Sequence, residues 1–190
     1  MVHMSLNKEQ RQRQLLLVLA KASIQHGLQT GKPLKIDLAD YPTELQKPRA
    51  TFVTLNIHHE LRGCIGMLEA IRPLAEDVTE NAFSAAFKDS RFPPLSPDEF
   101  KDLEIHVSIL TPAEPIVFTS EQDLINQLQP GIDGLILQEG YRRRTFLPSV
   151  WESLPNPEQF LRHLKQKAGL PPDYWSDTIR VLRYRTEGVG

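Results

Sequence analysis

The chain has 190 residues, of which 40% are apolar and 24% are charged. This size and composition suit one domain, or one domain with a small appended lobe, and they supply enough apolar side chains for a core. The formal net charge is −2 at pH 7, which excludes the strongly basic character of a dedicated nucleic-acid-binding protein. We therefore do not expect nucleic acid as a partner.

Hydropathy and cysteine content narrow the class further. The longest apolar run covers residues 15–20, well short of the ~20 residues that a membrane-spanning helix needs. The polar start of the chain is unlike a secretory signal. Cys64 is the single cysteine, which excludes an internal disulfide and a cysteine-based zinc cluster. We expect a cytoplasmic protein without a membrane contact, a metal or a cofactor.

The first half of the chain predicts a helix, a hairpin and a second helix. A proline-free interval capped by Asn7 predicts a helix over 6–31, and three prolines make 32–48 an irregular connection. Alternating apolar residues over 49–67 predict a β-hairpin with His58 and His59 at its polar tip. Pro73 is placed to begin the next helix.

The second half adds strands and two shorter helices. The predicted elements are a strand over 103–109, a helix over 120–129, strands over 134–138 and 142–146, a helix over 157–168 and a strand over 178–184. Hairpins mixed with helices that do not alternate regularly with the strands predict an α+β fold, with an antiparallel sheet flanked by helices.

The segment Leu61-Arg62-Gly63-Cys64-Ile65-Gly66 is the densest candidate for chemistry. On a regular strand Arg62 and Cys64 point to the same face, where the guanidinium would favour the thiolate. Gly63 and Gly66 within a strand indicate the close approach of a ligand or of another backbone. The alternative is an ordinary buried cysteine between glycines that form a bulge.

A second candidate is the segment Lys88-Asp89-Ser90-Arg91-Phe92-Pro93-Pro94-Leu95. Paired prolines fix a loop, and a fixed loop can hold Asp89, Ser90 and Arg91 in a defined arrangement. The alternative interpretation is a helix end with Arg91 near the helix dipole and Asp89 in a local turn.

Histidines and the arginine triplet carry weaker signals. The adjacent His58 and His59 suit a solvated tip better than a metal site, and His106 suits a sheet position. Arg142, Arg143 and Arg144 dominate a surplus of basic residues after residue 141. We interpret the triplet as a solvated edge, with a phosphate or carboxylate site as the alternative.

The ordered motifs LRGCIG (61–66), KDSRFPPL (88–95), GIDGLIL (131–137), RRTFLPSVW (143–151) and RYRTEG (183–188) resemble the AMME chromosomal region domain family. Its microbial members are called AmmeMemoRadiSam system protein A. The resemblance spans about residues 10–187. It marks Arg62, Gly63, Cys64, Gly66 and the Asp89–Pro93 segment, with Gly134, Thr145, Phe146 and Pro148 further along. Asp133 stands where several members have histidine, so the role of that side chain is open.

The resemblance implies a single domain over 1–190, made of a larger α+β part and a smaller lobe. The expected lobe covers approximately 32–50 and parts of 115–175, with LRGCIG near the groove between the two parts. The family name also implies two candidate partners, a Memo-like protein and a radical S-adenosylmethionine protein.

Two functions follow as hypotheses. The favoured one is an accessory module that binds a partner or a small molecule, with Gly63, Gly66, Ser90, Arg91 and Thr145 as binding residues. The other is a cysteine-dependent enzyme that acts on a small anionic substrate. Cys64 would then be the nucleophile or redox thiol, Arg62 would hold the thiolate, and Asp89 would take or position a proton.

Overall fold

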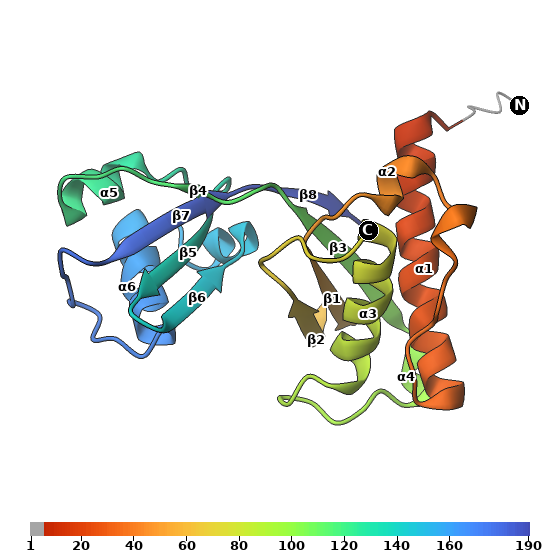
Figure 1. Cartoon of the computed structure of the whole chain (residues 1–190). Coiled ribbons are helices and arrows are strands. Elements are labelled where there is room, and N and C mark those ends of the chain that lie inside the picture. Colours follow the sequence, from red (N-terminus) through yellow and green to blue (C-terminus); the bar gives the residue numbers. More distant parts are fainter. Residues whose placement is uncertain (1–5) are drawn as a thin grey trace, which may run out of the picture. The chain divides into compact units, whose positions relative to one another are not determined.

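The computed structural model describes residues 6–190, which form two compact units (Figure 1). The first unit runs to Leu110 and also includes Glu187–Gly190, and the second unit is Thr111–Thr186. Helices of the first unit are α1 (Lys8–Thr30), α2 (Thr43–Gln46), α3 (Leu74–Phe87) and α4 (Pro97–Phe100). Those of the second unit are α5 (Glu121–Gln127) and α6 (Pro157–Lys167), with 3₁₀ turns elsewhere at Leu38–Asp40 and Pro148–Glu152.

Each unit is built on its own four-stranded sheet. The first sheet has the order β2-β1-β3-β8, with β1 at Thr51–Ile57, β2 at Glu60–Gly66, β3 at Leu103–Leu110 and β8 at Thr186–Val189. The second has the order β4-β7-β5-β6, with β4 at Glu114–Pro115, β5 at Gly134–Glu139, β6 at Arg142–Phe146 and β7 at Arg180–Tyr184. The hairpin β1–β2 and the hairpin β5–β6 are both antiparallel. The predicted α+β class is therefore confirmed.

Helix α1 begins and ends where its sequence signals place it. Asn7 Oδ1 accepts a hydrogen bond of 2.8 Å from Gln10 N, and Gln10 Oε1 accepts one of 3.0 Å from Asn7 N. This reciprocal capping satisfies two amide groups at the start of the helix. Gly31 ends the helix with φ at +72°, a conformation that glycine adopts without a steric penalty.

The core of the first unit lies between the sheet and its helices. Val53, Leu55 and Val107 on the inner face of the sheet are completely buried. Figure 1 shows α3 lying against this face, with α1 packed alongside α3. The alternating side chains of β1 and β3 thus present one apolar face to α3, as their sequence predicts.

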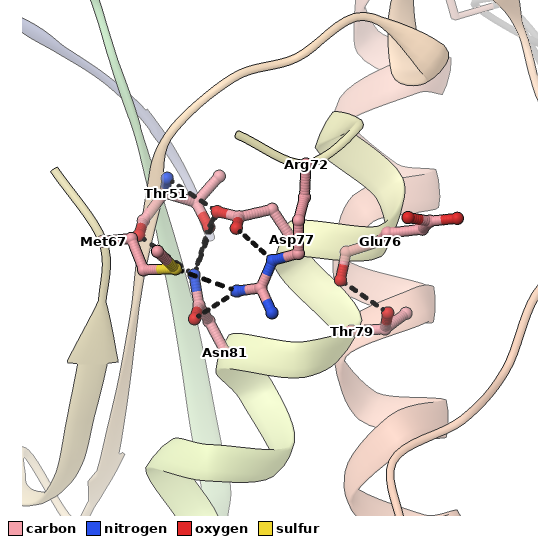
Figure 2. A network of polar contacts seen from close by, with 7 residues as sticks. All are labelled: Thr51, Met67, Arg72, Glu76, Asp77, Thr79 and Asn81. Atoms are coloured by element: carbon pink, nitrogen blue, oxygen red, sulfur yellow. Dashed lines mark hydrogen bonds and ion pairs between the residues drawn. The ribbon is translucent and has the colours of Figure 1, made fainter. Parts of the chain in front are cut away.

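A buried polar network fastens α3 to the start of β1 (Figure 2). Asp77 Oδ2 accepts hydrogen bonds from Thr51 N at 2.9 Å and Thr51 Oγ1 at 2.7 Å. Asp77 Oδ1 accepts one of 2.9 Å from Arg72 Nε. Asn81 donates to the Thr51 carbonyl at 3.1 Å and accepts from Arg72 Nη2 at 3.2 Å. Because each buried group is paired, the network stabilises one position of α3 on the sheet.

Three details differ from the sequence prediction. Residues 32–50 belong to the first unit and not to the second, because Leu45 of α2 is 1% exposed within the core of the first unit. Pro73 is the residue before α3 and not its first residue. The strand β8 follows a break after Tyr184 and joins the first sheet, whereas its short polar sequence predicts no strand.

The second unit packs α6 against its sheet. Leu135 and Leu137 of β5 are completely buried, as is Phe160 of α6. The Trp151 ring stacks on Phe160 with ring centroids 3.7 Å apart, and Trp151 Nε1 donates to the Asp133 carbonyl at 2.8 Å. Asn156 caps α6 and Pro157 is its first residue, as the sequence predicts.

Candidate functional site

The LRGCIG strand contains a β-bulge at Arg62. In the pairing of β1 with β2, Leu55 lies opposite Gly63 and Asn56 lies opposite Leu61. Arg62 is therefore the extra residue on β2, so this strand does contain a bulge, but at Arg62 and not at the glycines that the sequence analysis named. Bulges re-aim side chains and are common next to functional sites.

The two glycines of the motif are explained by the fold itself. A Cβ atom on Gly63 would overlap the backbone carbonyl oxygen of Ala85 in α3. A Cβ atom on Gly66 would overlap the Phe52 ring and the Thr51 carbonyl oxygen. The close approach that the glycines signal is thus to neighbouring parts of the first unit.

Cys64 lies on the face of the sheet opposite the core. It pairs with Thr54 across β1, and its Sγ lies 3.3 Å from Thr54 Oγ1. The side chain is half-buried. Thr54 pairs in turn with His106 of β3, so His106 is two strand spacings from Cys64. That separation, about 10 Å, is too long for a direct thiol–imidazole hydrogen bond.

Asp89 connects the LRGCIG strand to the DSRFPP loop. Its carboxylate accepts hydrogen bonds from Cys64 N at 3.0 Å, and from Arg91 N, Nε and Nη2 at 3.1, 3.0 and 2.7 Å. The Arg91 guanidinium, opposed by burial and aided by the two backbone amides, holds the pKa of Asp89 well below its usual range. A carboxylate this weakly basic positions its neighbours and is a poor proton acceptor at neutral pH.

Arg91 is held in a fixed but accessible position. Its side chain is 56% exposed, while Asp89 fixes the guanidinium and the Phe92 ring lies 5.5 Å from it. The bond to Asp89 raises the pKa of Arg91, against a smaller opposing effect of burial. Ser90, which lies between Asp89 and Arg91 in the sequence, is exposed.

Arg62 is occupied by a partner that the sequence analysis missed. Its Nε and Nη2 donate to Glu99 at 2.6 and 3.1 Å, and Nη2 also donates to the Pro93 carbonyl at 2.8 Å. The bond from Arg62, opposed by burial and aided by Ser96, lowers the pKa of Glu99 to about 2. This pairing differs from the expected role of Arg62 in holding the thiolate.

The sequence around Glu99 contains only a helix-start signal. Ser96 and Glu99 form a capping box at the start of α4, which the spacing Ser96-Pro97-Asp98-Glu99 encodes. That spacing identifies a helix start, but it does not reveal that the same carboxylate reaches Arg62 on β2. The two motifs are thus joined twice, through Asp89 to Cys64 and through Arg62 to Pro93 and Glu99.

Thr145 and Asp133 belong to the second unit, and their hydrogen-bond partners lie in that unit. Thr145 Oγ1 donates to the Leu135 carbonyl at 2.8 Å and lies 2.7 Å from the Tyr184 hydroxyl. Burial raises the pKa of Tyr184 to about 12, against the opposing bond to Thr145. Asp133 is completely buried, and its Oδ2 accepts a hydrogen bond of 2.8 Å from Gln129 N.

Within residues 6–190, no group of three or more His, Cys, Asp and Glu side chains is arranged to hold a metal ion. Over the same residues, no helix combines the length and the apolar character needed to cross a bilayer.

The chain is thus a two-sheet α+β protein in which a bulged LRGCIG strand is hydrogen-bonded to a DSRFPP loop. The AMMECR1 family model matches residues 17–189, and the chain belongs to the AMMECR1 family. It is 38% identical over 178 residues to a protein of Methanothermobacter thermautotrophicus, covering 90% of each chain. It is 40% identical over 176 residues to Protein MJ0810 of Methanocaldococcus jannaschii, covering 88% of this chain and 84% of the relative.

A solved structure shares the whole architecture. The crystal structure of the uncharacterized protein PH0010 from Pyrococcus horikoshii matches with a TM-score of 0.87 and 36% identity, over 94% of this chain and 90% of that one. The identification that LRGCIG and its companion motifs suggested is therefore confirmed.

Proposed function

We propose that this AMMECR1-family protein is a non-catalytic binding module that recognises an acidic group on a partner protein. The proposed site is the motif surface, which we define as the accessible parts of Cys64, Ser90, Arg91 and Phe92. The expected groove at LRGCIG is part of this proposal.

The observation that carries the proposal is the pairing of Asp89 with Arg91. Asp89 accepts both Nε and Nη2 of the guanidinium, so the Arg91 side chain is already ordered before anything binds. An ordered, accessible guanidinium loses little conformational entropy on meeting a carboxylate or phosphate, and it binds such groups with geometric specificity.

The distribution of acids and bases favours binding over catalysis. The carboxylates in contact with this region are Asp89 and Glu99, and arginine neighbours hold the pKa of each below its ordinary value. His106 lies two strand spacings from the thiol. The arrangement therefore supplies a fixed cation and a half-buried thiol, with these carboxylates poorly suited to accept a proton.

The candidate partners come from the family resemblance, namely a Memo-like protein and a radical S-adenosylmethionine protein. Size-exclusion chromatography of the full chain with each candidate tests the proposal, with Arg91→Glu as the key variant. We expect a complex with the wild type and its loss in the variant, because the reversed charge repels an acidic partner group.

Arg13→Glu is the charge-reversal control, since Arg13 is also an exposed arginine paired with a carboxylate, at 2.8 Å from Glu9. Because Asp89 is 5% exposed and Glu9 is 70% exposed, urea denaturation must first show that Arg91→Glu is folded. A complex that survives Arg91→Glu contradicts the proposed site. Failure of both partners to bind at tens of micromolar contradicts the proposed partners, and a phosphate or carboxylate metabolite that co-purifies in an Arg91-dependent manner would identify a small anion in their place.

A second function is favoured by one observation: Cys64 N and Arg91 Nη2 donate to the same Asp89 oxygen, at 3.0 and 2.7 Å, which joins the backbone of the cysteine to the guanidinium through one carboxylate. A thiolate stabilised by a nearby cation is a competent nucleophile. The rate of alkylation by iodoacetamide against pH tests this function, with a midpoint well below ~8.5 as the supporting result. Loss of activity in Cys64→Ala, with partner binding intact, would replace the binding module with a cysteine-dependent enzyme.

A further inference from the structure

A cavity of about 130 Å³ lies in the first unit, between the first half of α1, α2 and β8. None of its lining residues belongs to the motif surface. Its floor is apolar and consists of the buried side chains Leu16, Leu45, Leu74, Ile109 and Val189. Figure 1 shows α2 beside the N-terminal half of α1, and residues of both helices line the cavity. The cavity is a different site from the one proposed above.

Two polar side chains bring unused hydrogen-bond donors to the cavity. Gln12 and Arg49 line it, and Gln12 Nε2 and Arg49 Nε are buried with no hydrogen-bond partner among residues 6–190. A buried donor without a partner is costly, so each of these atoms needs an acceptor from outside the polypeptide, which is either water or a bound ligand. Both atoms are donors, and the group that meets them must therefore carry acceptors.

The charges around the cavity limit how many negative charges a ligand can bring. Arg49 is half-buried, and Glu187 lies 3.6 Å from its Nη2 on the exposed side. Glu9 and Glu44 line the rim, and each is neutralised by a neighbouring cation, Arg13 at 2.8 Å and Lys47 at 2.9 Å. The lining holds three glutamates and two arginines, so a ligand with one negative charge suits it better than a di- or triphosphate.

We propose that this cavity binds a small monocarboxylate with a compact apolar body. An apolar cavity of about 150 Å³ accommodates benzene, so a cavity of about 130 Å³ suits a branched or cyclic body of similar size. The apolar body would contact Leu16, Leu45 and Val189, and the carboxylate would accept from Gln12 and Arg49. This inference is independent of the motif surface and of the partner proposed for it.

Ligand-observed NMR titration of the full chain tests the proposal, with isovalerate as the probe and isopentylamine as its matched cationic counterpart. We expect saturable binding of isovalerate, and binding of isopentylamine at least about tenfold weaker, because the cavity offers donors and a guanidinium. Arg49→Met, which removes the guanidinium and keeps the length of the apolar stem, should weaken isovalerate binding by about tenfold or more.

Val189→Phe fills the cavity from the end of β8 and should abolish isovalerate binding. Val18→Phe is the matched control, because Val18 is 61% exposed on α1 and should leave the affinity within about twofold of wild type. Circular dichroism checks that each variant is folded. If Val189→Phe is unfolded, the isovalerate affinity of Arg49→Met alone tests the proposal. Three results would overturn the proposal and show that water alone occupies the cavity. They are isovalerate binding that does not saturate, isovalerate binding that persists in both cavity variants, and an affinity for isopentylamine equal to that for isovalerate.

Discussion

The backbone N–H of Cys64 donates a hydrogen bond of 3.0 Å to Oδ2 of Asp89. This bond crosses from the LRGCIG strand to the DSRFPP loop, and Asp89 in turn fixes Arg91. The side chain of Asp89 is only 5% exposed. The carboxylate therefore links the two motifs, and its removal should disturb both the LRGCIG strand and the DSRFPP loop.

Asp89→Asn should lower the free energy of unfolding by about 2 kcal/mol. The amide keeps one acceptor but places N–H groups toward Cys64 N and the guanidinium, where further donors are unfavourable. The Arg91 side of the pair is solvent-screened, which keeps the figure modest. Urea denaturation measures the change. Asp98→Asn, on the exposed first turn of α4, is the control and should stay within about 0.5 kcal/mol of wild type. An equal loss of unfolding free energy in the two variants would contradict the role of Asp89 in linking the two motifs.

Acid should destabilise the protein through Glu99. Its pKa is lowered to about 2 in the folded protein by the bond from Arg62, from an ordinary value of 4.5. The unfolded chain binds more protons between these values, so stability is present above pH 4.5 and is lost as the pH falls toward 2. After allowance for the exposed part of the carboxylate, Glu99 should account for about 1–2 kcal/mol of this loss.

The variant Glu99→Gln isolates this contribution. Its unfolding free energy should vary less between pH 4.5 and pH 2 than that of the wild type, as followed by far-UV circular dichroism, because Trp151 and Trp175 lie in the second unit whereas Glu99 lies in the first. Glu158→Gln, an exposed residue in the first turn of α6, should keep the wild-type slope. Parallel curves for wild type and Glu99→Gln would show that the pairing with Arg62 does not persist in solution.

Gly63→Ala should destabilise the first unit by about 3 kcal/mol, because the added methyl group overlaps the Ala85 carbonyl oxygen. The strand or α3 would have to move to relieve the overlap. Gly188→Ala is a milder comparison, since its Cβ meets only the His106 ring at 3.1 Å, and an exposed side chain can move. Thermal unfolding ranks the two variants, and a smaller effect at Gly63 than at Gly188 would refute the backbone-contact explanation.

Asp77→Ala should cost about 3 kcal/mol or more, because it leaves buried donors of Thr51 and the Arg72 guanidinium without their acceptor (Figure 2). Glu76→Ala is adjacent on α3, and in Figure 2 only the Glu76 backbone carbonyl takes part in the contacts drawn. Its cost should be below about 1 kcal/mol. Chemical denaturation compares the two, and similar costs would mean that the network does not fasten α3.

Local signals predicted most of the fold because they act over a few residues. The capping of α1 by Asn7 and of α6 by Asn156 follows from contacts within one helical turn. The alternation in β3 reports which side chains face the core. In contrast, β8 has no apolar alternation of its own, and it becomes a strand because the edge of β3 is available to it.

The candidate site was predictable in part for the same reason. The sequence identified Cys64, Asp89 and Arg91 as members of two special segments, and Asp89 does contact both other residues. The pairing of Arg62 with Glu99 was not predictable, because 37 positions separate the two residues and nothing local to either one specifies the other. A bulge that inserts one residue into β2 is likewise a property of the paired strands.

The place of β8 in the first sheet has a consequence for biosynthesis. The strand is encoded after the entire second unit, so a nascent chain emerging from the ribosome carries β3 with an open edge while Thr111–Thr186 is being translated. Unpaired edges invite association with other chains. The first unit therefore keeps an exposed strand edge on β3 until Thr186–Val189 has been synthesised and can pair with it.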